Sequence, residues 1–310
     1  MATVMKKGVA LVMGGWSPER EVSLSSGREC AKALRDRGYR VRAIDVGHDL
    51  PALLRALEPR PDAIFNALHG VGGEDGTIQG VFEMLQIPYT HSGVRASALA
   101  MHKPTAKELF ARAGLPVVEG FVAERDALLR HDPPPAPFVV KPTNQGSTVG
   151  VRIVRAGDNS WHEEIETWRF GDEVLVERYV PGRELTVAVM GERALGVCEI
   201  IPRSSDFYDY TAKYAPGGSE HLVPAPLPPR DYECALDVAL RAHRALGCRG
   251  VSRADFRYDD SGGEGRLYLL EINTQPGMTP TSLVPDIARH AGIAFDELVA
   301  WIVENATCGG

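Results

Sequence analysis

Residues 251–273 read VSRADFRYDDSGGEGRLYLLEIN, and this is the most informative stretch of the chain. Two apolar runs flank a turn of Asp, Ser and Gly, which predicts a β-hairpin. If the hairpin is symmetric about Gly263, Asp255 lies opposite Glu271 and Arg253 lies opposite Asn273. The four side chains then share one face of the hairpin, because side chains alternate along a strand.

Three of these side chains offer oxygen atoms, and their arrangement predicts a magnesium site. Asp255, Glu271 and Asn273 suit Mg²⁺, which takes a few carboxylate or amide oxygens and completes its octahedron with phosphates and water. The alternative is an edge hairpin with a solvated polar face and an ion pair. The following residues 274–282, TQPGMTPTS, favour the metal site, because Gly277 can offer a backbone N–H to an oxyanion.

Residues 141–150, KPTNQGSTVG, couple a lysine at the end of an apolar strand to a loop of Gly, Ser and Thr. A flexible backbone with hydroxyls can fold over phosphate oxygens, and Lys141 supplies the compensating charge. The alternative is a plain hairpin turn. Glu177 and Glu184 follow at a strand end, where the alternative is a pair of surface carboxylates.

The first hundred residues alternate strand and helix patterns, which predicts a doubly wound parallel sheet of the α/β class. The apolar run 9–13 is typical of a strand buried on both faces, and Gly14-Gly15 turns the chain after it. The further elements expected here are a helix at 23–37, a strand at 40–46, a helix at 50–57, a strand at 63–67 and a helix at 77–85. Because ligands bind beyond the carboxyl ends of such strands, residues 14–15 and 68–70 are expected near a site.

Two further units follow, and we expect domain boundaries at 1–99, 100–182 and 183–310. For the second unit we expect a helix at 104–113 and strands at 120–123, 138–141, 149–154 and 174–179. For the third we expect strands at 184–190 and 194–201, a loop at 203–221, a helix at 231–246, the hairpin 251–273 and a helix at 295–303.

Composition and charge exclude several classes of protein. The 310 residues carry 34 Lys and Arg against 41 Asp and Glu, a net charge of −7, so no general basic field attracts nucleic acid. No apolar stretch approaches a membrane span, and the short run after Lys6-Lys7 lacks the cleavage site of a secretory signal. A P-loop, a G-x-G-x-x-G motif and a zincin helix at His162 are also absent. We therefore expect a cytoplasmic protein without a nucleic-acid or membrane partner.

Five cysteines are spread through the chain without a C-x-x-C pair: Cys30, Cys198, Cys234, Cys248 and Cys308. This odd number predicts reduced, mostly buried thiols rather than disulfides. A catalytic cysteine would need an electropositive setting, of which the sequence gives no sign.

Five segments resemble, in order and spacing, the D-alanine:D-alanine ligase family of ATP-grasp carboxylate–amine ligases. They are GGWSPEREVS (14–23), NALHG with EDGTIQG (66–80), KP with GS (141–147), FYDY with AKY (207–214), and EIN with PGMT (271–279). The resemblance implies a three-domain ATP-grasp architecture, in which an N-terminal doubly wound parallel sheet precedes two α+β domains that clasp ATP. It also implies ligation of two D-alanines to D-alanyl-D-alanine through an acyl phosphate, releasing ADP and phosphate, for peptidoglycan precursor synthesis.

The resemblance further implies a role for each matching residue, two Mg²⁺ or Mn²⁺ ions, room for a monovalent cation, and a homodimer. Lys103, Lys141 and Lys213 would contact phosphates, Glu177, Tyr179, Val180 and Glu184 would hold adenine and ribose, and Asp255, Glu271 and Asn273 would bind metal. Glu19 would pair with the ammonium of the first D-alanine, with Ser147 and Tyr214 completing its network, and His69 would neighbour that amino acid's carboxylate. Arg253 and the Gly277 N–H would form the oxyanion hole, and Ser282 would bind the second D-alanine's carboxylate.

The sequence departs from the family pattern at three places. The phosphate loop 143–148 reads TNQGST, where the family has Arg-Glu before the Gly and a second Ser after it. Met101-His102 stands where an acidic residue is usual, and Gln275 is a less common choice. Two alternatives stay open from the sequence: a ligase with another acceptor such as D-lactate, against which Tyr214 and Glu19 argue, and a nucleotide-binding regulatory protein that has lost catalysis.

Overall fold

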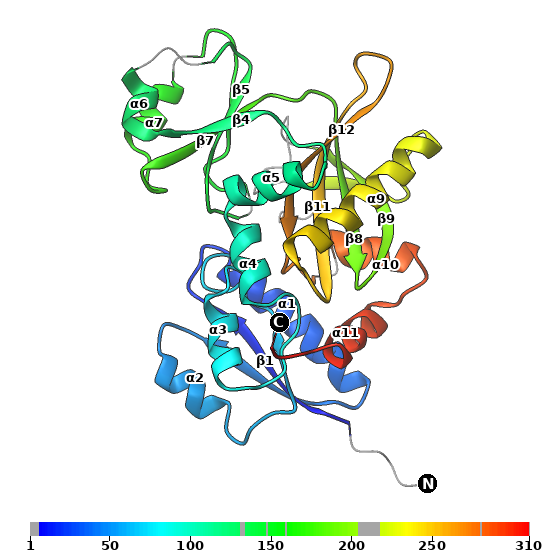
Figure 1. Ribbon diagram of the computed structural model, residues 1–310. Helices are drawn as coiled ribbons and strands as arrows, with labels where there is room; N and C mark the ends of the chain where they lie inside the picture. The colour runs from blue at the N-terminus through cyan, green and yellow to red at the C-terminus, as the bar shows by residue number, and fades with distance from the viewer. Residues whose placement is uncertain are drawn as a thin grey trace.

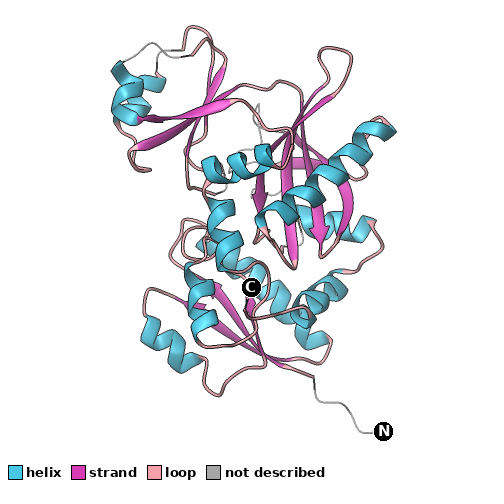
Figure 2. Ribbon diagram, viewed as in Figure 1, coloured by secondary structure: helices cyan, strands magenta, loops and turns pink. Residues whose placement is uncertain are grey.

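The computed structural model describes residues 6–130, 134–146, 148–158, 160–203, 218–279 and 281–309. Within these ranges the named strands form three separate sheets, each flanked by helices (Figure 1). One sheet is parallel and two are antiparallel, which confirms the predicted mixed α/β architecture (Figure 2). Two helices, α4 (Val94–Met101) and α5 (Lys103–Arg112), lead from the parallel sheet to the antiparallel ones.

The parallel sheet has the strand order β2-β1-β3 and is the doubly wound unit that the sequence predicts. Its elements are β1 (Gly8–Gly14), α1 (Arg20–Asp36), β2 (Arg40–Val46), α2 (Leu50–Ala56), β3 (Ala63–Asn66) and α3 (Thr77–Met84). Along β1, Val9 and Leu11 pack with α1 and the late helix α11 (Phe295–Glu304), whereas Ala10 and Val12 pack with α2 and α3. Helices on both faces require apolar residues at every position of the strand, which explains the unbroken apolar run.

The second sheet is antiparallel, with the order β4-β7-β5-β6. Its elements are β4 (Gly120–Glu124), α6 (Arg125–Arg130), β5 (Phe138–Pro142), β6 (Arg152–Val154), α7 (Trp161–Glu166) and β7 (Glu173–Arg178). Phe138 and Val140 of β5 pack against Trp161, while Val139 and Lys141 line a pocket. The period of two along the strand therefore separates the face that packs on Trp161 from the face that lines the pocket.

The third sheet is antiparallel, with the order β10-β9-β8-β11-β12. Its elements are β8 (Arg183–Met190), β9 (Arg193–Pro202), β10 (Ser219–Leu222), α9 (Pro229–Leu246), β11 (Val251–Asp259), β12 (Arg266–Asn273) and α10 (Leu283–His290). Leu185 and Val187 belong to the apolar cluster beneath α9, whereas Ala188 and Cys198 pack with α10. Helices thus cover both faces, and the hairpin β11–β12 forms one edge of the sheet.

Several element boundaries differ from those predicted. β6 begins at Arg152 and not at Val149, because Gly150 has a φ of 73° and the chain is still turning there. The sequence predicts a loop throughout 203–221, but β10 pairs with β9 at its end, and residues 204–217 lie outside the described ranges. The helices α4, α6 and α10 also lack a sequence prediction, because six to eight residues give a weak periodic pattern.

All five cysteines are free, as the sequence predicts, but most of them are not buried. Cys30 and Cys198 are buried, whereas Cys234 is exposed on the outer face of α9 and the other two are intermediate. The prediction of mostly buried thiols is therefore wrong. In the described ranges no helix is both long and apolar enough to cross a membrane.

Candidate active site

The hairpin β11–β12 pairs as predicted at its polar end, with Asp255 opposite Glu271 and Arg253 opposite Asn273. The hairpin is nevertheless not symmetric about Gly263, because Phe256 pairs with Leu269 and the register shifts between Asp255 and Phe256. A β-bulge supplies the extra residue and brings the polar pairs back into register. The predicted face is therefore correct, while the symmetry used to predict it holds only on one side of the bulge.

The side chains of Arg253 and Asp255 form a two-point ion pair on β11. The guanidinium donates from Nε to Asp255 Oδ1 at 2.8 Å and from Nη2 to Oδ2 at 2.6 Å. Thr186 on the adjacent strand β8 donates its hydroxyl to Asp255 Oδ1 at 2.7 Å. Asp255 is thus fixed from two strands, and the planar pair keeps Arg253 beside the pocket.

Helix α5 brings a lysine to the neighbouring carboxylate. Lys103, its first residue, places Nζ 2.6 Å from Glu271 Oε2 and donates its backbone N–H to the Thr143 carbonyl at 2.8 Å. His102 caps the helix, and its Nδ1 accepts the backbone N–H of Thr105 at 3.4 Å. Histidine therefore takes the capping position at which the sequence departs from the acidic pattern.

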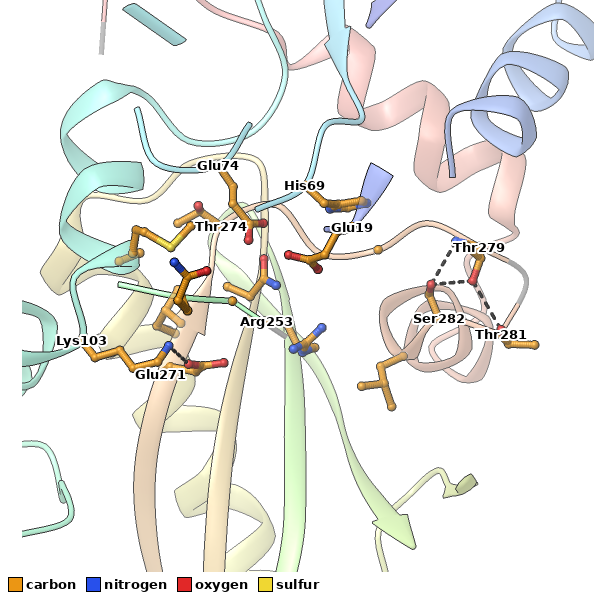
Figure 3. A pocket seen from close by; sticks show the side chains of 18 residues that line it. Glu19, His69, Glu74, Lys103, Arg253, Glu271, Thr274, Thr279, Thr281 and Ser282 are labelled. Carbon is orange, nitrogen blue, oxygen red and sulfur yellow. Dashed lines mark hydrogen bonds and ion pairs between the residues drawn. The ribbon is translucent and has the colours of Figure 1, made fainter. Parts of the chain in front are cut away.

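Two loops of the parallel sheet bring Glu19, His69 and Glu74 to one place, as Figure 3 shows. Glu19 is buried at the start of α1, and its backbone N–H donates to Ser17 Oγ, whose hydroxyl donates in turn to the His69 carbonyl. Gly70 has a φ of 70°, and a Cβ there would lie 2.9 Å from Glu19 Oε2. Glycine is thus required at position 70 for the backbone to pass the carboxylate.

The carboxyl group of Glu74 is buried and lines this pocket. Burial, followed by the charge of Glu19, raises the pKa of the Glu74 carboxyl well above its usual range. Among the described residues its Oε2 has no hydrogen-bond partner. A Cβ on Gly146 would lie 3.1 Å from Glu74 Oε1 and 3.2 Å from Glu19 Oε2, so the phosphate loop approaches both carboxyl groups.

The loop after β12 closes the pocket on the opposite side. Ser282 stands at the N-cap of α10, and its hydroxyl oxygen accepts the Thr279 N–H at 2.9 Å. The Met278 N–H donates to Ser26 Oγ on α1 at 3.1 Å. Gln275 and Asn66 exchange hydrogen bonds, so the unusual glutamine fastens the loop to the end of β3.

A second pocket lies between the two antiparallel sheets. Lys141 Nζ stands 2.5 Å from Glu177 Oε2, and Arg257 Nη1 lies 3.6 Å from Glu184 Oε2. Arg257 also donates to the carbonyl of Val180 at 3.2 Å. The lining of this pocket shares three residues with the first, namely Lys103, Gln145 and Glu271. The two pockets therefore meet at the lysine–glutamate pair.

The comparisons with known proteins agree along the chain. The family model described as D-ala D-ala ligase C-terminus matches residues 109–304, and the N-terminus model matches residues 52–92. The D-alanine–D-alanine ligase of Acidiphilium cryptum (strain JF-5) is 59% identical over 302 residues, which are 97% of this chain and 99% of that relative. The ligase of Sinorhizobium medicae (strain WSM419) is 57% identical over 97% of this chain and 98% of its own length. The chain belongs to the D-alanine–D-alanine ligase family.

A solved member of the ligase family has the same architecture. The crystal structure of the D-alanine–D-alanine ligase from Bacillus anthracis complexed with ATP superposes with a TM-score of 0.81. It is 30% identical in sequence, with 97% of this chain and 96% of that chain covered. The predicted ATP-grasp architecture is thereby confirmed.

Most residues predicted from the ligase family resemblance line the two pockets. Those lining the first are Glu19, His69, Lys103, Arg253, Glu271, Asn273, Gly277 and Ser282. Those lining the second are Lys103, Lys141, Glu177, Tyr179, Val180, Glu184, Asp255 and Glu271. The predicted residues Ser147, Lys213 and Tyr214 lie outside the described ranges.

Sequence reasoning missed three charged residues that the ligase fold places at or behind these pockets. Glu74 stands next to Asp75 in the run EDG. The sequence does not show which of two adjacent acidic residues is buried, and in the structure Glu74 is buried. Lys107 stands one helical turn after Lys103, a spacing that was the available signal for a shared face. Arg257 follows Asp255 by two residues on β11. The two side chains share one face of the strand, because side chains alternate along it.

Proposed function

We propose that this protein ligates two D-alanines to D-alanyl-D-alanine, converting ATP to ADP and phosphate. The observation that carries the proposal is the junction of the two pockets at Lys103, Gln145 and Glu271. One pocket presents charged groups suited to an amino acid, and the other presents apolar walls with Lys141 and four carboxylates, suited to a nucleotide and its metal ions. A phosphoryl group bound at the junction would be within reach of both ligands.

ATP would lie in the second pocket, with adenine and ribose held by Glu177, Tyr179, Val180 and Glu184. Support comes from the ATP complex of the Bacillus anthracis relative and from the apolar side chains Val139 and Ile153 on the pocket wall. Lys141 and Lys103, together with Lys213, would neutralise the phosphates. Both described lysines are held by carboxylates, so phosphate oxygens would replace carboxylate oxygens as their partners.

The donor set of the hairpin fits one or two Mg²⁺ or Mn²⁺ ions. Asp255 and Glu271 are opposed carboxylates, and Asn273 Oδ1, which accepts the Gln275 N–H at 2.8 Å, keeps a second lone pair. Arg253 and Lys103 balance the two carboxylates, so a bound cation would take over part of that charge. When bound, the ions would draw charge from the phosphate oxygens of ATP.

The reaction would begin when the carboxylate of the first D-alanine attacks the γ-phosphorus of ATP, giving an acyl phosphate and ADP. Glu19 would hold the ammonium of this amino acid, and His69, whose pKa is lowered by burial, would stand near its carboxylate. The amine of the second D-alanine, seated by Ser282, would then attack the acyl carbon. Arg253 and the Gly277 N–H would stabilise the oxyanion until phosphate leaves, and the network of Glu19, Ser147 and Tyr214 would handle the ammonium proton.

The proposed activity is tested by measuring phosphate release from ATP with Mg²⁺ and millimolar D-alanine. We expect release that requires both D-alanine and a divalent cation, with D-alanyl-D-alanine as the product. Release that is equal with L-alanine, or absent with D-alanine, would refute the proposal. A parallel reaction with D-alanine and D-lactate, with products separated by chromatography, distinguishes a ligase for another acceptor.

We further propose a cytoplasmic homodimer that contains domains 1–99, 100–182 and 183–310 and supplies dipeptide for peptidoglycan precursors. Apolar side chains on α2 and α3 support self-association, since Leu50, Leu54 and Met84 are exposed by 45%, 39% and 87%. Light scattering would test the dimer, and a monomeric mass at micromolar concentration would refute it.

A further inference from the structure

Helix α5 directs two lysines, one helical turn apart, toward carboxylates of two different sheets. Lys103 pairs with Glu271 on β12, and Lys107 pairs through its Nζ with Glu177 Oε1 on β7. Lys141 on β5 reaches the other oxygen of the same carboxylate, Glu177 Oε2, at 2.5 Å. Glu177 therefore stands between two ammonium groups that approach from different elements.

The three side chains are almost completely removed from solvent. The side chain of Glu177 is 4% exposed, that of Lys107 11% and that of Lys141 9%. Burial raises the pKa of the Glu177 carboxyl, but the charges of Lys141 and Lys107 outweigh burial and hold that pKa below its usual value. Burial also lowers the pKa of Lys107, against the opposing effect of Glu177. A carboxylate in this place needs at least one cationic partner.

The two lysines differ in their relation to the nucleotide pocket. Lys141 and Glu177 line the pocket, whereas Lys107 lies behind Glu177 and is not part of the lining. Lys107 belongs to a helix that is anchored by the buried side chains of Ala106 and Phe110. Lys141 can therefore exchange Glu177 for a phosphate, while Lys107 has no access to the nucleotide.

We propose that Lys107 is a positioning residue that keeps Glu177 neutralised and in place when Lys141 moves to the phosphates of ATP. This inference rests on the proposed function, since it takes the phosphate role of Lys141 from there. Without Lys107, the departure of Lys141 would leave a buried carboxylate without a cation. The cost of that unpaired charge would oppose binding of any nucleotide that draws Lys141 away.

The test compares nucleotide binding by the wild type, Lys107→Met and Lys107→Arg, with Lys32→Met as the control on the exposed Lys32–Asp36 pair of α1. Titration calorimetry with Mg²⁺ and ADP, without D-alanine, gives the affinity directly. We expect Lys107→Met to weaken ADP binding by about tenfold or more, and Lys107→Arg to recover most of it, because arginine keeps the buried charge. Adenosine, which has no phosphate to attract Lys141, should bind within about twofold of wild type.

Steady-state kinetics add a second readout. The KM for ATP should rise in Lys107→Met, while the KM for D-alanine should stay within about twofold of wild type. Unchanged ADP affinity in Lys107→Met would overturn the proposal, and so would equal weakening of ADP and adenosine, which would indicate a role in shaping the adenine site alone.

A double variant keeps the test decisive if Lys107→Met folds poorly. In a Glu177→Gln background, which has no carboxylate to neutralise, adding Lys107→Met should change ADP affinity by less than about twofold, against about tenfold in the wild-type background. An equal loss of ADP affinity in both backgrounds would overturn the proposal. Absence of D-alanine-dependent phosphate release by wild-type protein would refute the proposed function instead, and ADP binding separates the two failures because it needs no D-alanine.

Discussion

Glu271 is one of the three residues that line both pockets, so its charge should matter more to turnover than to folding. Glu271→Gln preserves shape but removes the charge that would hold a metal ion against phosphate. We expect turnover to fall by about two orders of magnitude or more, with little change in the thermal midpoint. Phosphate release and thermal unfolding measure the two effects. The matched control is Glu264→Gln, at the exposed turn of the same hairpin. Near-normal turnover in Glu271→Gln would show that Glu271 does not act in catalysis.

His91 should contribute to the loss of stability in acid. Burial lowers the pKa of this imidazole to about 4, against 6.5 for an ordinary histidine. Between these values the unfolded chain binds a proton that the folded chain does not, so stability falls as the pH drops from 6.5 toward 4, by up to about 3 kcal/mol. His91 has a φ of 66°, which asparagine tolerates, so His91→Asn removes the titration without added backbone strain.

The measurement is the thermal midpoint of unfolding between pH 7 and pH 4.5. We expect His91→Asn to show a shallower fall than the wild type, although the smaller side chain lowers its stability at neutral pH. His290→Asn, at an exposed position on α10, should keep the wild-type slope. Parallel curves for His91→Asn and the wild type would contradict the assignment.

Among the helices and strands, the sequence predicts well those that have a strong local pattern of apolar and turn residues. The buried run of β1 and the long amphipathic α9 have strong sequence signals, and the turn residues between β11 and β12 mark a hairpin. The start of α10 was not predictable in the same way, because the helix has only eight residues and its cap contacts depend on the loop from β12. The bulge beside Asp255 also depends on neighbouring strands, which a single sequence does not display.

In the candidate site, too, residues marked by local sequence pattern were predicted, whereas residues that depend on tertiary packing were not. Residues with distinctive types and spacing, such as Asp255 and Glu271, were predicted from the hairpin alone. Glu74 and Lys107 were not, because a buried carboxylate and a buried lysine look like surface residues until the packing around them is known. Their roles arise from contacts between elements that lie far apart along the chain.

The loop after β3 carries Gly70 past the carboxylate of Glu19. Gly70→Ala should cost about 1–2 kcal/mol of stability, since an L side chain is strained at φ 70°, and its Cβ would displace Glu19. We expect a loss of D-alanine affinity that exceeds what this strain explains. Gly80→Ala in α3 is the control, because nothing lies within 4 Å of its new Cβ and alanine favours helix. Steady-state kinetics with D-alanine and unfolding curves for both variants measure these two effects. Normal D-alanine kinetics in Gly70→Ala would contradict the expected loss of affinity.

At the scale of the whole molecule, the nucleotide pocket lies between the second and third sheets and uses side chains from both. A nucleotide should therefore stabilise the fold as a unit. At about a hundredfold excess over its dissociation constant, Mg²⁺-ADP should add about 2.7 kcal/mol to the free energy of unfolding. Thermal unfolding with and without nucleotide measures this gain. Lys141→Met should lose most of it, whereas an undiminished gain in that variant would exclude Lys141 from phosphate binding.

The packing of α11 on α1 has a consequence for folding of the nascent chain on the ribosome. One face of the first sheet, including Val9 and Leu11, is completed by α11, which lies far from β1 along the chain. Thr307 also pairs with Tyr89 beside β3, so the C-terminal tail belongs to the same layer. A nascent chain that has not yet reached α11 therefore leaves an apolar face of the first sheet uncovered, and transiently exposed apolar surface of this kind favours aggregation.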